Sequence, residues 1–309
     1  MLNCISMADK ILWGIDLGGT KIEGAVFHSN APDSVLARVR IDTEAEQGYA
    51  HIITRINQLL GILKKETGLT PNSVGFSTPG ALDPNTLVMK NCNTTCLNGK
   101  KLDVDLKVAL KVPVLLANDA NCFALTEYQY GAGKNQPLVF GVIIGTGVGG
   151  GIVCNGKLIE GAHGIAGEWG HNIIEPSGPE CYCGRRGCIE RMMAGPRIEE
   201  YYRNKSGKNK KLAEIYQDSL NQDQIASEAL EYLLALFARS IATVINILDP
   251  HIIVLGGGLS NLPIFYTEAM RQRIAQQIFN PSFQALLVKN MLGDSAGVFG
   301  AGLLTTQPM

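Results

Sequence analysis

Two segments far apart in the chain share one pattern, in which an apolar strand, a glycine turn and a second apolar strand follow one another. The first reads ILWGIDLG, turns at Gly18 and Gly19, and resumes as KIEGAVF. The second reads LVFGVIIGTG and continues as GGGIVC, after which Asn155 and Gly156 predict a tight hairpin. The two halves of the chain therefore begin alike, and we expect two domains.

Around these hairpins, strands alternate with helices, which is typical of α/β proteins. The periodicity of apolar residues predicts helices over residues 48–68, 121–133, 196–217, 227–250 and 297–306, and strands over 74–80, 112–119 and 251–260. The strand over 112–119 brings Asn118 and Asp119 to its carboxyl end. We place the division near residue 120, with a small N-terminal domain of residues 10–119 plus 296–309 and a larger domain of residues 120–295.

The composition is that of a globular protein whose partners are small molecules and itself. Of the 309 residues 46% are hydrophobic and 18% charged, and the formal net charge is −1. No basic block favours nucleic acid or an anionic membrane, and no apolar run approaches the length of a membrane span. The N-terminus lacks the apolar region of a signal peptide, which predicts a cytoplasmic protein with reduced thiols; Met7 is an alternative start to Met1.

Four potential ligands for a soft metal lie close together in GEWGHNIIEPSGPECYCGRRGCIE: His171, Cys181, Cys183 and Cys188. Zinc prefers thiolate and imidazole in a tetrahedron, and C-x-C followed by G-x-x-G-C bends the backbone so that the sulfurs converge. Four protein ligands leave no open position for chemistry, so we expect a structural zinc. The alternative is that these are ordinary buried thiols. The other five cysteines are scattered and fit that alternative: Cys4, Cys92, Cys96, Cys122 and Cys154.

The two glycine turns are candidate phosphate-binding loops. Gly145, Gly147 and Gly150 match the dinucleotide motif G-x-G-x-x-G, but that motif needs a helix to follow, and here a hairpin follows. The two turns, with hydroxyls at Thr20 and Thr146, instead indicate cradles that grip a triphosphate from two sides, since glycine lets backbone N–H groups approach phosphate oxygens. The alternative is that the glycines only form tight turns.

Other residues near these turns suit a magnesium nucleotide. Asp16, just before the first turn, is a natural ligand for a water on Mg²⁺. Lys21 is either a phosphate contact or a surface residue, and the sequence slightly favours the surface. Gly256, Gly257 and Gly258, after a buried strand, would let an adenosine ring approach the backbone.

Asn118, Asp119, Glu168, His171 and Glu190 form a set that is rich in hydrogen-bond acceptors and contains no arginine. Such a pocket suits a neutral polyol, because sugar hydroxyls donate to carboxylates, whereas an anion would meet like charge. Asp119 precedes a predicted helix and is equally well placed to cap it. The sequence alone leaves its role open.

These residues resemble one family, the ROK sugar kinases, named for repressor, open reading frame and kinase. GIDLGGTK, STPG, LANDAN, GTGVGGG, GEWGH, CYCGRRGCIE and VLGGG occur in the order of that family, between Leu12 and Ala301. The resemblance implies an actin-like ATPase fold of two ribonuclease-H-like α/β domains, with the active site in the cleft between them and the C-terminal helix returning to the first domain.

The resemblance also implies roles for individual residues. Asp119 would be the general base, the four clustered ligands would hold zinc, and a homodimer is expected. The implied sugar-binding residues are Gly80, Asn93, Asn118, Asp119, Glu168, His171 and Glu190, with Asn98 and Gly99 lining the same site. The implied binding residues for ATP with Mg²⁺ are Asp16, Gly18, Gly19, Thr20, Lys21, Gly145, Thr146, Gly147, Gly149, Gly256, Gly257 and Gly258.

Within the family, LVMKNCNTTCLNGKKL and GEWGHN are similar to the bacterial fructokinase, or manno(fructo)kinase, branch. This predicts transfer of the γ-phosphoryl group of ATP to a hexose, most simply at its 6-hydroxyl, with fructose preferred and mannose or glucose tolerated. The alternative is an N-acetylglucosamine kinase or a glucokinase. A sugar-sensing transcription regulator is disfavoured, because the residues before Gly14 hold no helix-turn-helix. A catalytically dead sugar-binding protein is disfavoured by the presence of Asp119 and both turns.

Overall fold

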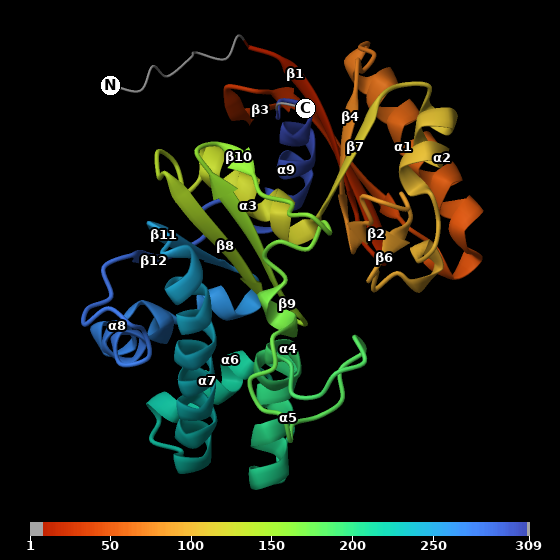
Figure 1. The fold of residues 1–309 in the computed structure, drawn as a ribbon. Coiled ribbons are helices and arrows are strands. Elements are labelled where there is room, and N and C mark those ends of the chain that lie inside the picture. Colours follow the sequence, from red (N-terminus) through yellow and green to blue (C-terminus); the bar gives the residue numbers. More distant parts are fainter. Residues whose placement is uncertain (1–8, 308–309) are drawn as a thin grey trace. The chain divides into compact units, whose positions relative to one another are not determined.

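The computed structural model describes residues 9–307, which fall into two compact units (Figure 1). The first unit holds the chain up to Tyr130, the segment Gly156–Ala166 and the residues from Asp294 onward, and the second holds Gly131–Asn155 and Gly167–Gly293. The structure divides the chain later than residue 120, because helix α3 (Asp119–Tyr130) packs against helix α9 (Ala296–Leu304) within the first unit. Met1, Cys4 and Met7 lie outside the described residues.

The sheet of the first unit has the strand order β3-β2-β1-β4-β7. Strands β1 (Ile11–Leu17), β2 (Lys21–His28) and β3 (Ala31–Asp42) form antiparallel pairs. Strands β4 (Val74–Thr78) and β7 (Val114–Asn118) continue the sheet in parallel with β1. The predicted hairpin at Gly18 and Gly19 is therefore confirmed as the β1–β2 connection.

Helices cover both faces of this sheet. On one face, α1 (Tyr49–Thr67) and α2 (Leu102–Leu110) bury their apolar stripes against β1, β2 and β4, and Ile15, Leu59 and Leu106 belong to one continuous buried cluster. On the other face, α9 contacts β1 and β4 and lies beside α3 (Figure 1, blue and yellow). Side chains alternate along a strand, so neighbouring residues of β1 serve the two faces in turn.

The sheet of the second unit repeats this topology. Strands β8 (Leu138–Ile144) and β9 (Val148–Cys154) form an antiparallel hairpin, and β11 (Ile252–Gly256) and β12 (Leu286–Lys289) pair in parallel beyond β8. The order β9-β8-β11-β12 matches β2-β1-β4-β7, as expected from the similar beginnings of the two halves. The short strand β10 (Lys157–Leu158) follows the turn at Asn155, whose φ of 49° agrees with an Asn-Gly turn.

The second unit also contains five helices: α4 (Ile189–Met193), α5 (Gly195–Ser206), α6 (Leu212–Leu220), α7 (Gln224–Leu248) and α8 (Glu268–Ala275). The side chain of Asp223 caps α7 by accepting from the backbone N–H of Ala226, and the helix ends at Asp249 before Pro250. Contrary to the sequence expectation, α7 is long and apolar enough to cross a membrane. Its most apolar window is 56% buried inside its unit, however, which is the behaviour of a core helix.

Most long elements lie where apolar periodicity predicts them, but several short ones were not predicted. The helical segment predicted over 196–217, in which the basic residues indicated a solvated loop, is divided into α5 and α6, because Gly207 ends α5 with a φ of 72°. The elements that sequence reasoning missed are β3, α2, α4, α8 and β12, the two-stranded sheet of β5 (Ala81–Leu82) and β6 (Met89–Lys90), and the 3-10 turns Ala45–Gln47, Thr95–Leu97, Trp169–His171, Gly258–Asn261, Pro263–Tyr266 and Gly293–Ser295.

Glycines let α9 approach the first sheet at backbone distance. A Cβ atom placed on Gly14 of β1 would lie 2.0 Å from the carbonyl oxygen of Val298, and one on Gly75 of β4 would lie 1.7 Å from that of Ala301. A Cβ on Gly300 of α9 would lie 2.0 Å from the carbonyl oxygen of Cys122 in α3. These positions admit no side chain, because the neighbouring atoms belong to backbones that are fixed by their own hydrogen bonds.

We predict that Gly75→Ala lowers the free energy of unfolding by about 1–3 kcal/mol or more, because its methyl group would force α9 away from β4. Gly61→Ala is the matched control, since nothing lies within 4 Å of a Cβ at Gly61, which is inside α1. That control should gain about 0.5–1 kcal/mol from the higher helix propensity of alanine. Urea unfolding measures the stability of both variants. Equal free energies of unfolding would contradict the close backbone contact between β4 and α9.

Candidate functional site

The first candidate site is a cavity of about 290 Å³ in the first unit, at the carboxyl ends of β1, β4 and β7. Five of the residues predicted from the sequence line it: Asp16, Gly18, Gly19, Asn93 and Asp119. Sequence reasoning missed its other four lining residues, Leu17, Thr78, Pro79 and Thr94. Ligand sites in open α/β sheets commonly lie at this end of the strands, so the position itself indicates a binding site.

The structure shows how Asn118 and Asp119 lie at the start of α3. The side-chain oxygen of Asn118 accepts from the backbone N–H of Asn121 at 2.8 Å, three residues further on, which is the geometry of a helix cap. The side chain of Asp119 accepts from the adjacent N–H of Ala120 at 2.8 Å, and it is exposed and lines the cavity. Asn118 therefore caps α3, and the Asp119 carboxylate faces the cavity at the positive end of the helix.

Asp16 contributes the second carboxylate of this cavity. Burial raises the pKa of its carboxyl group above the usual value, and the neighbouring Ser77 hydroxyl opposes that shift. The first turn of α9 lies directly against it, since a Cβ atom on Gly297 would be 2.8 Å from Oδ2 of Asp16. The position of Asp16 therefore depends on the close approach of α9.

The loop from Asn91 to Gly99 forms one wall of the same cavity. Asn98 closes this loop, because its side chain both accepts from the N–H of Cys92 at 2.8 Å and donates to its carbonyl oxygen at 3.2 Å. A Cβ atom on Gly80 would lie 2.6 Å from the carbonyl oxygen of Lys90, so Gly80 lets β4 meet the loop. Asn98 and Gly80 therefore shape the wall, and Asn93 is the predicted sugar residue that lines the cavity.

Thr20 and Lys21 do not line the cavity. Both side chains are exposed, and the carbonyl oxygen of Thr20 accepts from the N–H of Thr43 in the edge of the sheet. The exposed position of Lys21 agrees with the expectation that it is a surface residue. The glycine turn itself lies in the cavity, through Gly18 and Gly19.

A second cavity, of about 720 Å³, lies in the second unit beside the turn between β8 and β9. Three residues predicted to bind the nucleotide line it: Gly145, Thr146 and Gly258. Sequence reasoning missed its apolar wall, which α5, α6 and the turn after β11 supply through Pro196, Leu212, Ala213, Tyr216, Leu259 and Leu262. A mostly apolar cavity with a glycine turn at its edge suits a flat aromatic ring attached to a phosphate chain.

The other predicted nucleotide glycines of the second unit do not line this cavity. Gly256 is buried within β11, and a Cβ on Gly257 would lie 2.5 Å from the carbonyl oxygen of Ile144. A Cβ on Gly147 would lie 2.6 Å from Oε2 of Glu190, and the carbonyl oxygen of Gly149 accepts from the indole N–H of Trp169 at 2.9 Å. The space beside these glycines is therefore taken by protein atoms, which agrees with the alternative that they only allow tight turns and close packing.

Three more predicted sugar ligands gather beside this hairpin in the second unit. Glu190, in the first turn of α4, accepts from the N–H of Val148 at 3.0 Å. Burial raises the pKa of the Tyr182 hydroxyl, and the nearby carboxylates of Glu190 and Glu168 raise it further. The same hydroxyl lies 3.0 Å from Nε2 of His171. Glu168, His171 and Glu190 therefore form one polar group, to which Tyr182 adds a hydroxyl that sequence reasoning missed.

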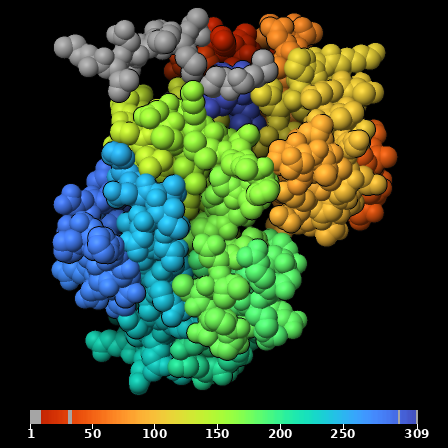
Figure 2. Space-filling view, in the orientation of Figure 1, coloured from red at the N-terminus to blue at the C-terminus, as the bar shows by residue number. Residues whose placement is uncertain are grey.

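The four predicted metal ligands come together in the second unit. All four ligand atoms lie within 4.8 Å of one another, with 3.6 Å between Sγ of Cys181 and Nδ1 of His171 and 3.6 Å between the sulfurs of Cys183 and Cys188. Tetrahedral zinc would place two sulfurs about 3.8 Å apart and a sulfur and a nitrogen about 3.6 Å apart. The residues therefore fit zinc, and the ligand-bearing loop lies at the surface of its unit (Figure 2, green).

Glycines produce the bend of this loop, as its spacing predicted. Gly184 and Gly187 have φ angles of 84° and 65°, which side chains other than glycine rarely adopt. A Cβ on Gly187 would also lie 1.5 Å from the carbonyl oxygen of Glu175. Among residues 9–307, no other set of histidine, cysteine and acidic side chains forms such a cluster, and the remaining described cysteines are free thiols elsewhere.

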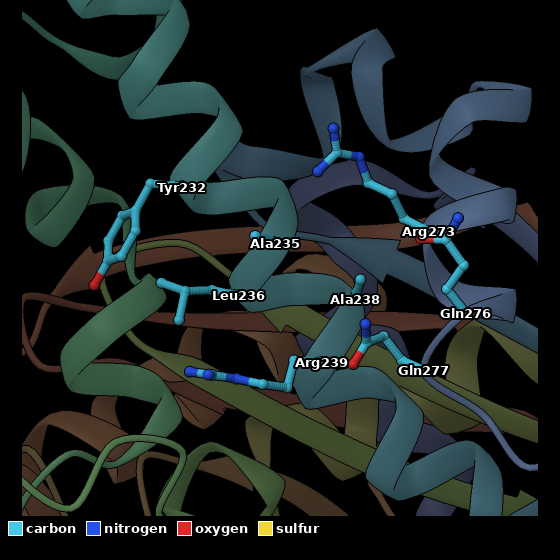
Figure 3. Close-up of a pocket in the computed structure, with 8 residues that line it drawn as sticks. All are labelled: Tyr232, Ala235, Leu236, Ala238, Arg239, Arg273, Gln276 and Gln277. Carbon is cyan, nitrogen blue, oxygen red and sulfur yellow. The ribbon is translucent and has the colours of Figure 1, made fainter.

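A third cavity, of about 360 Å³, lies between α7 and α8 and contains none of the predicted residues (Figure 3). Its two guanidinium groups, of Arg239 and Arg273, point in different directions (Figure 3). The guanidinium group of Arg273 donates a hydrogen bond to Oε2 of Glu231 at 2.7 Å. The charged groups therefore do not converge on one ligand, and we do not include this cavity in the site.

Comparison with known proteins identifies the family. The model of the ROK family matches residues 12–308. The chain belongs to the ROK family. An N-acetyl-D-glucosamine kinase of Histophilus somni is 35% identical over 303 residues, covering 94% of this chain and 98% of that protein. Seven further relatives, 32–35% identical, carry the same name.

Solved structures confirm the predicted actin-like fold of the ROK family. A ROK hexokinase from Thermus thermophilus has a TM-score of 0.84 and 29% identity, covering 95% of this chain and 97% of that one. A ROK family glucokinase from Streptomyces griseus, solved with glucose and AMPPNP, has a TM-score of 0.77 and 25% identity, covering 96% and 99%. The relatives named above are N-acetyl-D-glucosamine kinases, and the predicted fructokinase branch finds no support among them.

We predict that the purified chain contains about one zinc ion, and that Cys183→Ser loses it. Without the metal, three thiols and an imidazole no longer hold the loop, so the melting temperature should fall by at least about 5 °C and sugar affinity should fall with it. Cys154→Ser is the control, because Cys154 is a free thiol outside the cluster. Elemental analysis and thermal unfolding test this, and active wild-type protein without zinc would show the expectation to be wrong.

Proposed function

We propose that this protein transfers the γ-phosphoryl group of ATP to a hydroxyl of N-acetyl-D-glucosamine, most simply the 6-hydroxyl. The kinase reaction is supported chiefly by the cavity that the Asp119 carboxylate lines together with Asp16 and the turn at Gly18 and Gly19. Membership of the ROK family and the kinases among its relatives support the same reaction. The preference for an N-acetyl sugar is supported by the names of those relatives.

In the proposed reaction, Asp119 is the general base. Its carboxylate accepts the proton of the sugar hydroxyl while the hydroxyl oxygen attacks the γ-phosphorus, and the bond to the departing ADP breaks. The N-terminus of α3 favours the charged carboxylate in that place. Mg²⁺ would neutralise phosphate charge, and Asp16 is the residue that would hold it through a bound water.

The nucleotide would use the second cavity. Its apolar wall from Pro196, Leu212 and Leu259 suits the faces of an adenine ring, and Gly145 and Thr146 would meet the phosphates. Gly258 is the predicted adenosine contact that lines this cavity, and nothing lies within 4 Å of a Cβ there.

The sugar would be held by acceptors and a few donors. Glu168, Glu190, His171, Asn93 and Asn118 are the proposed ligands, as the family resemblance implies. The carbonyl oxygen of an acetamido group can only accept hydrogen bonds, so it needs a donor beside the carboxylates of Glu168 and Glu190. The Tyr182 hydroxyl supports an N-acetyl sugar in this respect, because it lies beside His171 and close to Glu168 and Glu190.

Two side chains that could have crowded an acetamido group are occupied elsewhere. Trp169 is 3% exposed and packs edge-to-face against Phe140 within the second unit. Leu97 is fully buried in the apolar cluster of the first unit. Because both side chains are buried within the protein, they would not crowd an acetamido group, which supports the bulkier substrate.

Several further expectations stay proposals. The Cys₃His cluster would hold a structural zinc that fixes the loop carrying His171 and the start of α4 with Glu190. A homodimer and a cytoplasmic location remain predictions. A transcription regulator is the non-enzymatic alternative, and measurable turnover would argue against it.

We predict that Asp119→Asn folds normally and loses about 10²- to 10⁴-fold in kcat, because the amide cannot accept the proton. Asp223→Asn is the matched control, since Asp223 also begins a helix and asparagine caps as well as aspartate. Coupled ADP-release kinetics and circular dichroism provide the measurements. Near-normal kcat in Asp119→Asn would refute the assignment of the base.

We predict that N-acetyl-D-glucosamine exceeds fructose in kcat/KM by more than about tenfold, which corresponds to about 1.4 kcal/mol of transition-state binding. Glucose and mannose should show weaker turnover, because small substituents are discriminated only modestly. ADP release is measured across these sugars and N-acetylmannosamine, with a sugar-free reaction as the blank. A tenfold preference for fructose would restore the fructokinase interpretation.

A further inference from the structure

Thr94 carries a buried hydroxyl group without a hydrogen-bond partner. The residue is 7% exposed, and its Oγ1 makes no hydrogen bond in the structure. It lines the cavity that also contains Asp16 and Asp119. Burying a hydroxyl without a partner is unfavourable, and such a group in a cavity calls for a ligand that completes its hydrogen bonding.

The surrounding loop holds this hydroxyl in place. The carbonyl oxygen of Thr94 accepts from the N–H of Leu97 at 3.0 Å, and the N–H of Asn93 donates to Pro79 at 3.3 Å. The Leu97 side chain anchors the loop in the apolar cluster of the first unit. The Oγ1 atom therefore has a defined position, next to the glycine turn: a Cβ atom on Gly19 would lie 3.3 Å from it.

The other threonine of the cavity is committed to the protein. Thr78 Oγ1 lies 2.8 Å from the carbonyl oxygen of Gly80 and 3.1 Å from that of Ala117, so its hydroxyl proton is already donated to the protein backbone. The charged side chains that line the cavity, Asp16 and Asp119, are carboxylates. Carboxylates accept from sugar hydroxyls, but they repel the oxygens of a phosphoryl group.

We propose that the Thr94 hydroxyl donates a hydrogen bond to an oxygen of the phosphoryl group during its transfer. This inference rests on the proposed kinase function and adds a residue that no part of the sequence pattern singled out. Thr94 supplies a neutral donor in the cavity that Gly19 and the proposed base Asp119 also line, where the phosphoryl group and the carboxylate would both bring negative charge. The threonine forms and breaks no covalent bond.

Thr94→Val tests this proposal, because valine resembles threonine in shape but lacks the hydroxyl. We expect kcat to fall about 10- to 100-fold, with the KM for N-acetyl-D-glucosamine within about threefold of wild type. Removal of an unpaired buried hydroxyl should leave the unfolding midpoint unchanged or raise it. The kcat should thus fall while the unfolding midpoint does not, whereas loss of a purely structural residue would lower both.

Two variants complete the experiment. Thr94→Ser keeps the hydroxyl and should recover kcat to within about threefold of wild type. Thr95→Val is the matched control in the same loop, since Thr95 is exposed and does not line the cavity. It should behave as wild type in both measurements.

Each other result overturns the inference in a distinct way. Normal kcat in Thr94→Val would show that the hydroxyl takes no part in the transfer. A tenfold higher sugar KM in Thr94→Val with unchanged kcat would show that the hydroxyl binds the sugar instead. A lower unfolding midpoint, with kcat equally reduced in Thr94→Val and Thr94→Ser, would show that Thr94 has a structural role. If wild-type protein transfers phosphate from ATP to none of the sugars, the proposed function fails as well, so the two failures are distinguishable.

Discussion

The packing of α9 against the first sheet determines where both carboxylates of the first cavity lie. The helix can approach at backbone distance only because Gly75 on β4 and Gly300 on α9 lack side chains. Its first turn then lies against Asp16, and the contact at Gly300 fixes the helix that begins with Asp119. A geometry defined by backbone contacts is stiff, which suits the roles proposed for the two carboxylates, holding a cation through Asp16 and accepting a proton at Asp119.

In the second unit, close packing of β9 has the corresponding role. A Cβ atom on Gly150 would lie 2.8 Å from the carbonyl oxygen of Gly167, and one on Gly170 would lie 2.1 Å from that of Val148. The segment carrying Glu168 and His171 is thereby pressed onto the hairpin, and the cysteine–histidine cluster connects it to the helix of Glu190. Metal binding at the cluster would stabilise Glu168 and Glu190, two of the proposed sugar ligands, which lie outside it.

The glycines of the two turns therefore have two distinct uses. Gly18, Gly19 and Gly145 line cavities, as expected of phosphate-binding loops, whereas Gly150 and Gly257 make room for protein backbone. Sequence motifs do not separate these uses, because absence of a Cβ atom permits the approach of a phosphate and of a carbonyl group equally well. Only the identity of the neighbouring atoms distinguishes them.

Local sequence information determined much of this protein. Alternating apolar residues, the Asn155 turn and the spacing of the cysteines predicted the two hairpins, the long helices and the metal cluster, because each depends on residues close together in the chain. Tertiary structure decided which side chains meet: that Asn118 caps α3, that Leu212 and Leu259 form one apolar wall, and that the hydroxyl of Thr94 is buried beside Gly19. These features arise from packing between elements, and no periodicity or spacing within one element records which surface another element will cover.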